Sequence, residues 1–412
     1  MEGAYNPVMR LNIPRSKLCC RSKLIAPVLL IGILFGGNTV SAQAPQTHMR
    51  KSEKRRELPI TDFYNVPVPL PPAKPGTLIR SEAFDDYDLS ADMSALRILY
   101  HSRSGSGKDV AVSGVVLIPQ GKPPNGGWPV IAWAHSFSGV ARRCAPSLMT
   151  NIFDGPLLSM YLSLGYAVAA TDYAGLGTGS RYAALDTQSN AEDVINAVAA
   201  AHAATPGLSS KWIAVGDLQG AAVAIRIAEL PGARDPDYLG SVAISEVADP
   251  QNLFESLMQT HFAGIFSVLA YGVKTVFPEF KPGDMLTDKG TKTFAEVEST
   301  CGVPDSPDVA GREMLQSGWE KNSYVAQFLA RNTIGLTPTH EPVLVIIGGS
   351  DALFSASLTS QLVKQMCQQH DHVIFDEFPN VDRGSVLGTS VSDQISWIQA
   401  RFSGRPEASN CK

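Results

Sequence analysis

The chain has 412 residues, of which 44% are hydrophobic and 18% are charged. That length and composition suit one large domain with an insertion, or two smaller domains, and they allow a substantial core to form without disulfides. A formal net charge of −5 gives no sign of nucleic-acid binding or of a polybasic membrane patch.

The first 42 residues are typical of an export leader. Basic residues at positions 10, 15, 17, 21 and 23 precede an apolar run over 24–37, and Val40-Ser41-Ala42 offers small residues for cleavage. The run is shorter than the roughly 20 residues of a membrane span. A cleaved signal peptide over 1–42 is therefore expected, with an uncleaved anchor as the alternative. Cleavage removes five basic residues and one acid, which changes the net charge from −5 to −9. The mature product is expected to be secreted or periplasmic, with no integral membrane span.

The remaining chain begins with a proline-rich stretch over 43–85, which predicts an extended arm rather than helix or strand. Strand-like apolar runs then alternate with helical patterns. Short, almost wholly apolar strands between helices indicate an α/β fold, with a mostly parallel sheet covered by helices on both faces. The expected strands are 109–119, 129–134, 166–171, 212–215, 241–245, 342–347 and 373–378, and the expected helices are 156–165, 191–204, 221–230 and 391–402.

The stretch over 251–335 interrupts this alternation. It is longer than one crossover, and its apolar run over 262–271 is followed by charged, turn-rich sequence. We interpret it as an inserted helical cap, with additional core helices as the alternative. The core of the fold would then occupy 86–250 and 336–412.

The sequence Val215-Gly216-Asp217-Leu218-Gln219-Gly220 stands between an expected strand and an expected helix. This is the layout of a nucleophile elbow, Gly-x-Ser-x-Gly, whose central residue adopts a strained backbone conformation. The flanking Gly216 and Gly220 are needed because such a turn tolerates no side chains nearby. Leu218 occupies the central position, and its isobutyl group has no lone pair or acidic proton with which to attack a carbonyl.

Several other motifs accompany the elbow. They are Pro75-Gly76-Thr77-Leu78-Ile79-Arg80-Ser81-Glu82, Ala132-Trp133-Ala134-His135, Ala141-Arg142-Arg143-Cys144-Ala145-Pro146-Ser147 and Asp172-Tyr173-Ala174-Gly175-Leu176-Gly177. In combination they resemble the secretory lipase family of bacteria and fungi, over nearly the whole mature chain. The resemblance implies an α/β-hydrolase fold, a Ser-Asp-His triad, a cap over an acyl pocket, and a hydrophobic or acyl ester ligand. It implies no cofactor.

Each member of the implied triad can be placed on this sequence. The nucleophile position falls on Leu218, and the acid position falls on Asp351, which is retained. The base position falls on Arg383, where the family has histidine. A guanidinium stays protonated and has no acceptor, so it cannot take a proton from a hydroxyl. Two arrangements of Arg383 stay open: a bidentate ion pair with Asp351, or displacement into solvent.

The loop expected to form the oxyanion hole also departs from the family. The family's His-Gly-Thr-Thr-Gly is replaced by His135-Ser136-Phe137-Ser138-Gly139. Ser136 in place of glycine puts in doubt the backbone geometry that presents an N–H to the oxyanion. Gln219 keeps the other expected donor, its own backbone N–H. His135 is expected to be a hydrogen-bonded scaffold residue rather than a base.

Four cysteines remain after the leader: Cys144, Cys301, Cys367 and Cys411. An even number in an exported protein favours two disulfides, for which three pairings exist. No cysteine or histidine cluster has zinc spacing, so no metal site is expected. The resemblance implies the pairs Cys144–Cys301 and Cys367–Cys411.

Three hypotheses about function follow from these departures. The first is a secreted pseudoenzyme that binds acyl or other hydrophobic ligands. The second is an active ester hydrolase or triacylglycerol lipase with another nucleophile, although an elbow centred on Asp217 would need small residues at 215 and 219, and Ser136 lacks a histidine to activate it. The third is recent decay or deliberate inactivation, since each replacement requires a single nucleotide change. The sequence identifies no protein partner.

Overall fold

The computed structural model describes residues 57–411, apart from 232–234, 247–248, 307, 352 and 407. The predicted leader and the beginning of the predicted arm lie outside the described residues. The described residues all belong to one compact unit.

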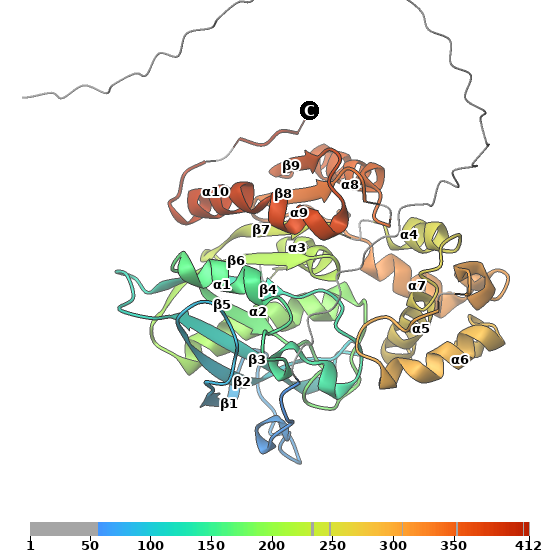
Figure 1. Ribbon diagram of the computed structural model, residues 1–412, viewed down its shortest axis with the longest axis horizontal. Coiled ribbons are helices and arrows are strands. Elements are labelled where there is room, and N and C mark those ends of the chain that lie inside the picture. The colour runs from blue at the N-terminus through green and yellow to red at the C-terminus, as the bar shows by residue number, and fades with distance from the viewer. Residues whose placement is uncertain are drawn as a thin grey trace, which may run out of the picture. The chain divides into compact units, whose positions relative to one another are not determined.

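Nine strands of the described chain form one mixed sheet (Figure 1), in the order β1-β2-β3-β5-β4-β6-β7-β8-β9. The pairs β1–β2, β2–β3 and β3–β5 are antiparallel, and all the other pairs are parallel. The strands are β1 (Leu78–Ala83), β2 (Met93–Arg103), β3 (Asp109–Pro119), β4 (Trp128–Ala134), β5 (Ala167–Thr171), β6 (Leu208–Asp217), β7 (Tyr238–Ile244), β8 (Val343–Gly348) and β9 (Val373–Phe378).

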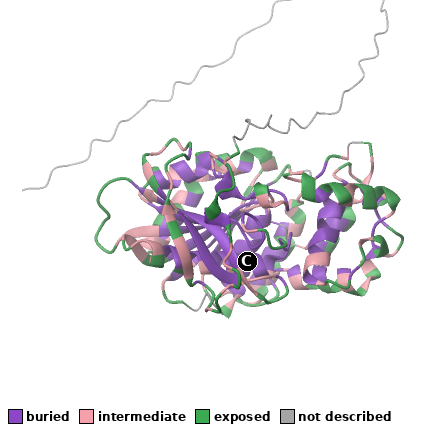
Figure 2. Ribbon diagram, turned by 90° about the horizontal axis from the view of Figure 1, so that it is seen from below, coloured by how far each residue is buried: buried purple, intermediate pink, exposed green. Residues whose placement is uncertain are grey.

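Helices cover both faces of the sheet, which creates two hydrophobic cores. Successive residues of β6 show this division: Trp212 and Ala214 belong to one core, and Ile213 and Val215 belong to the other. Helices α2 (Thr187–Ala204), α3 (Gln219–Glu229) and α8 (Ala356–Gln368) contribute to the first core. Helices α1 (Gly155–Ser163), α9 (Arg383–Thr389) and α10 (Val391–Phe402) contribute to the second. Figure 2 shows the buried residues concentrated in the sheet between these layers.

Four further helices lie together beside the sheet (Figure 1). They are α4 (Pro250–Leu257), α5 (Ile265–Val276), α6 (Asp288–Glu296) and α7 (Ser323–Asn332), and they fall in the stretch that we interpreted as a cap. Since they belong to the same compact unit as the sheet, their role as a separate cap stays a prediction. No described helix is both long and apolar enough to cross a bilayer.

The arm was predicted to contain no strand, and this is wrong for its last residues. Leu78–Ala83 form β1, an edge strand that pairs with β2. Strand β2 itself has no counterpart among the expected strands, because charged residues interrupt its apolar pattern. Arg97 of β2 is only 1% exposed, and its guanidinium carbon lies 3.3 Å from the centre of the Phe84 ring. The strand was not predicted because this arginine is buried against an aromatic ring, whereas a charged residue in a sequence pattern indicates an exposed position.

Two disulfides tie distant parts of the fold together, and both have the expected pairing. Cys144–Cys301 joins the loop that follows β4 to the segment between α6 and α7. Cys367–Cys411 joins α8 to the end of the described chain.

Candidate active site

The elbow between β6 and α3 has the backbone geometry that its glycines predicted. Leu218 lies in the turn with φ +54° and ψ −113°, a backbone conformation that residues other than glycine rarely adopt. Its N–H donates to the Ile244 carbonyl oxygen at 2.9 Å. A methyl group added to Gly216 would clash with the Gly220 carbonyl, and one added to Gly220 would clash with the Ala134 carbonyl. The two glycines therefore let α3 begin directly against the ends of β4 and β6.

An apolar cavity of about 240 Å³ opens beside the elbow. It brings together predicted site residues from three separate loops at the carboxyl ends of parallel strands, where ligands bind in open α/β sheets. The lining residues are Ser136, Phe137, Leu185, Thr187, Leu218, Gln219, Ala222, Pro250, Leu253, Phe254, Leu257, Phe262, Ile265, Val303, Phe328, Leu329, Asn332, Phe354 and Arg383.

Sequence reasoning missed the wall of this cavity that α4 supplies. Pro250, Leu253, Phe254 and Leu257 all line it. Their spacing of three, one and three residues places them on one face of a helix, so a signal was present. The same spacing also occurs on helices that pack against a core, and the pattern alone does not distinguish the two.

Asp351 lies on the loop after β8, and its carboxylate is only half satisfied. Its Oδ1 accepts hydrogen bonds from the backbone N–H groups of Leu353 at 2.8 Å and Phe354 at 2.9 Å. Its Oδ2 is buried and has no hydrogen-bond partner among the described residues. Leaving a buried oxygen without a hydrogen bond costs free energy of folding. This oxygen can accept a hydrogen bond from a neighbouring side chain.

Arg383 does not supply that donor. It is the first residue of α9, it is partly buried, and it lines the cavity. Its guanidinium carbon lies 5.4 Å from the centre of the Phe354 ring, a cation–π contact. Within the described chain, no ion pair joins it to Asp351, whose Oδ1 is already held by backbone amides. The ion-pair hypothesis is therefore wrong. So is full displacement into solvent, because stacking on Phe354 keeps the side chain at the cavity.

His135, which follows β4, is buried and lies within hydrogen-bonding distance of the backbone. Its ring lies 4.2 Å from that of Tyr173, and its Nδ1 is 2.6 Å from the Ser136 carbonyl oxygen. Burial lowers the pKa of His135 to about 4, so the imidazole is neutral at pH 7. The cavity lining includes Ser136 and Phe137 but not His135. No histidine of the described chain is therefore placed in the cavity to activate Ser136.

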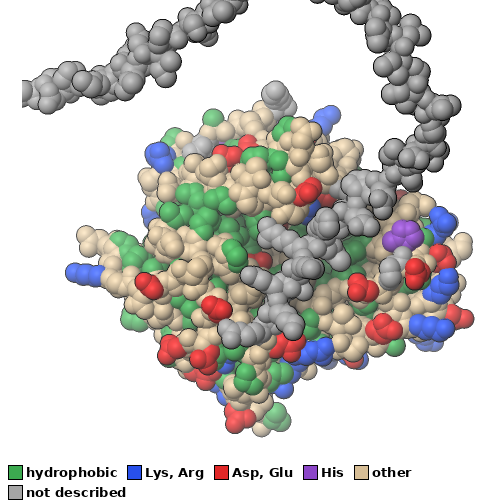
Figure 3. Space-filling view, in the orientation of Figure 1, with side chains coloured by type: hydrophobic (Ala, Val, Ile, Leu, Met, Phe, Trp, Pro, Cys, Tyr) green, Lys and Arg blue, Asp and Glu red, His purple; other side chains and the backbone are tan. Residues whose placement is uncertain are grey.

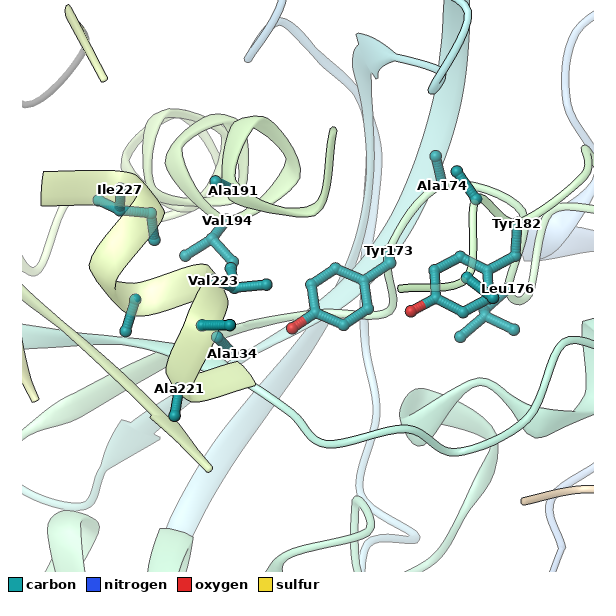
Figure 4. Packing of buried hydrophobic residues seen from close by; sticks show 14 of the residues in the cluster. Ala134, Tyr173, Ala174, Leu176, Tyr182, Ala191, Val194, Ala221, Val223 and Ile227 are labelled. Atoms are coloured by element: carbon teal, nitrogen blue, oxygen red, sulfur yellow. The ribbon is translucent and has the colours of Figure 1, made fainter. Parts of the chain in front are cut away.

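Gln219 stands directly after Leu218, at the first position of α3. Its Nε2 donates to the Tyr182 hydroxyl at 2.6 Å, and its Oε1 is buried without a partner among the described residues. The Tyr182 ring is parallel to that of Tyr173, with ring centres 6.0 Å apart. Figure 4 shows the Tyr173 ring on the side of Ala134 and α3, and the Tyr182 ring beyond it, beside Leu176. Because the first N–H groups of a helix have no intrahelical acceptor, the backbone of Gln219 keeps a donor near the elbow.

Asp217 precedes the elbow residue but does not line the cavity. Burial, and next the neighbouring Asp154, raise the pKa of Asp217 to about 8, against a smaller lowering effect of Arg383. A carboxyl group that is protonated at neutral pH and does not line the cavity is a poor nucleophile.

The fold and this set of positions define the class of protein, which is a lipase-like α/β-hydrolase. The chain belongs to the secretory lipase family, since the family model described as Secretory lipase matches residues 145–410. No curated protein matches the chain by sequence.

Solved structures with a similar fold include lipases, esterases and a putative hydrolase. Candida antarctica lipase A superposes with a TM-score of 0.73 and 17% identity, covering 86% of this chain and 89% of that chain. The rice cell wall degrading esterase LipA from Xanthomonas oryzae gives a TM-score of 0.64 and 18% identity, covering 80% of this chain and 98% of that chain. A putative hydrolase from Legionella pneumophila gives 0.65 and 17%, covering 81% of this chain and 100% of that chain.

The close packing at the elbow predicts that Gly220 is intolerant of a methyl group. Gly220→Ala should lower the free energy of unfolding by about 1–3 kcal/mol, because α3 must move away from Ala134. The matched control is Gly388→Ala in α9, where nothing lies within 4 Å of the added carbon, and where alanine should leave stability unchanged or raise it by up to about 1 kcal/mol. Urea denaturation measures both, and equal effects at the two positions would contradict the packing argument.

The raised pKa of Asp217 predicts a loss of stability with rising pH. The folded state holds the proton up to about pH 8, whereas the ordinary value is 3.8, so the contribution is lost as pH rises through that window. Asp217→Asn cannot ionise, and its melting temperature should fall less than that of the wild type between about pH 6 and about pH 9. The melting temperature of Asp217→Asn should still fall in part, because burial raises the pKa of Asp193 to about 8 as well. The exposed control Asp85→Asn should follow the wild type, and an unchanged fall for Asp217→Asn would refute this assignment.

Proposed function

We propose that this lipase-like protein does not hydrolyse esters by the serine mechanism and instead holds an acyl or other hydrophobic ligand in its cavity. One observation carries the proposal. Leu218 occupies the strained elbow and lines the cavity, so an alkyl group stands where the mechanism needs a nucleophile.

The base position supports the same conclusion. Arg383 lines the cavity with Leu218, and its guanidinium can donate protons to hydrogen bonds but cannot accept one. Because members of a triad act as a unit, loss of the nucleophile or of the base alone removes nearly as much activity as loss of both. Asp351 is the one member retained, with a buried oxygen that has no hydrogen-bond partner in the described chain.

A second candidate function is ester hydrolysis by another nucleophile. Ser136 favours it, because its hydroxyl-bearing side chain lines the same cavity. Against it stands the absence of a cavity-lining histidine within the described residues. Ser136 would have to attack without a general base, and we rank this candidate second.

The cellular setting agrees with the first candidate. Membership of the secretory lipase family and two disulfides fit an extracellular protein. We propose that residues 1–42 are a cleaved leader.

On the face drawn in Figure 3, acidic and basic side chains are interspersed around hydrophobic ones. We propose that the ligand is a hydrophobic small molecule rather than nucleic acid.

Ester hydrolysis tests the proposal directly. The wild-type protein should show no turnover of p-nitrophenyl butyrate above the buffer rate. Leu218→Ser with Arg383→His should gain turnover, because Asp351 is free to orient the new histidine.

The control adds Asp351→Asn to that double variant. It should remove most of the gained turnover, by a factor on the order of 10⁴ in a fully formed triad. Turnover by the wild type would overturn the proposal, and its loss in Ser136→Ala would assign the activity to Ser136. A silent double variant that is correctly folded would show that the site lacks more than its nucleophile and base.

A further inference from the structure

The cavity contains one charged side chain. Among the described lining residues, all but Arg383 are apolar or neutral polar. Two of the polar members, Thr187 and Asn332, bond to each other, with the threonine hydroxyl donating to the amide oxygen at 2.9 Å. The guanidinium is therefore the dominant polar feature that a ligand would meet.

The Arg383 guanidinium has hydrogen-bond donors that no protein group uses within the described chain. A guanidinium carries five N–H donors, and no hydrogen bond or ion pair joins this one to the rest of the described chain. Its guanidinium contacts the Phe354 ring, and an aromatic ring occupies a face of the guanidinium rather than its N–H edges. The edges are free to form the two parallel hydrogen bonds that a carboxylate accepts.

The surroundings leave this positive charge largely uncompensated. Burial keeps the nearby Asp217 protonated at neutral pH, with a pKa of about 8. Asp351 directs Oδ1 to two backbone amides and forms no ion pair with Arg383 in the described chain. An anionic ligand would therefore supply the partner that the protein does not.

We propose that the cavity binds a single-chain fatty acid, with its carboxylate on the Arg383 guanidinium and its alkyl chain against Leu218 and the α4 residues Leu253 and Phe254. The inference rests on the proposed function, because it requires a cavity that retains its ligand rather than turning it over. A volume of about 240 Å³ lies slightly below the roughly 300–1,000 Å³ of ordinary ligand sites, which suits one chain better than a triacylglycerol. A single arginine with no second cation in the lining suits a carboxylate better than a phosphate.

Calorimetric titration of the delipidated full-length protein tests the inference, with dodecanoate, dodecanol and methyl dodecanoate as probes. Dodecanoate should bind roughly 10- to 100-fold more tightly than either neutral probe, the factor expected for a charge-assisted hydrogen-bonded pair. Arg383→Met should remove that preference, because it weakens dodecanoate binding far more than dodecanol binding. Arg383→Lys should keep part of it, because the charge remains without the planar fork.

Two further variants locate the binding site. Leu253→Trp should fill the cavity and weaken the binding of all three probes, after circular dichroism has shown that the variant is folded. Arg405→Met changes an exposed arginine outside the cavity and should change nothing. Unchanged dodecanoate binding in Leu253→Trp would overturn the assignment to this cavity.

The outcomes separate this inference from the proposed function. Equal affinity for dodecanoate and dodecanol, unaffected by Arg383→Met, would overturn the carboxylate site while leaving a hydrophobic ligand in the cavity. Binding of none of the probes would overturn both the inference and the binding role. Release of methanol from methyl dodecanoate by the wild type would overturn the proposed loss of hydrolysis.

Discussion

The contact on which the site depends is the approach of the first turn of α3 to the ends of β4 and β6. Gly216 and Gly220 make it possible, because a methyl group on either would collide with backbone carbonyl oxygens. The turn then holds residue 218 at a positive φ and directs the start of α3 toward the cavity. This backbone therefore places whatever residue stands at 218 against the cavity, whether or not that residue can react.

Holding a leucine in such a turn costs on the order of 1–3 kcal/mol. In an active hydrolase that cost accompanies the exposure of a nucleophile, but here it accompanies no chemistry that Leu218 can perform. Contact of the isobutyl group with the apolar cavity offsets part of it. Leu218 and Arg383 line the same cavity. In our proposal, the leucine makes the cavity floor more apolar, and the arginine places a permanent cation where the family has a titratable histidine. This paired change is the physical basis for regarding the site as one that binds.

Much of the fold followed from the sequence because the central strands are uniformly apolar. Strands β3 and β9 and helix α10 have the expected bounds, and the elbow lies where its glycines predicted. Strand β2 was not predicted, because Arg97 is buried against the Phe84 ring rather than exposed. The direction of the Arg383 side chain could not be predicted either, because the choice between Asp351 and Phe354 depends on backbone amides that already hold the carboxylate. Sequence patterns thus predicted the turn at Leu218, whereas the side-chain contacts around it emerged only from the packing.

Covalent labelling tests the central claim, that no activated nucleophile stands at the elbow, most directly. The wild-type protein would be incubated with a fluorophosphonate that reacts with activated serines, and its intact mass would be recorded beside that of the Leu218→Ser/Arg383→His variant. We expect no adduct on the wild type and one adduct on the variant, mapped by peptide analysis to the introduced serine. A stoichiometric adduct on any wild-type residue would contradict the account and would identify the nucleophile that the structure does not assign.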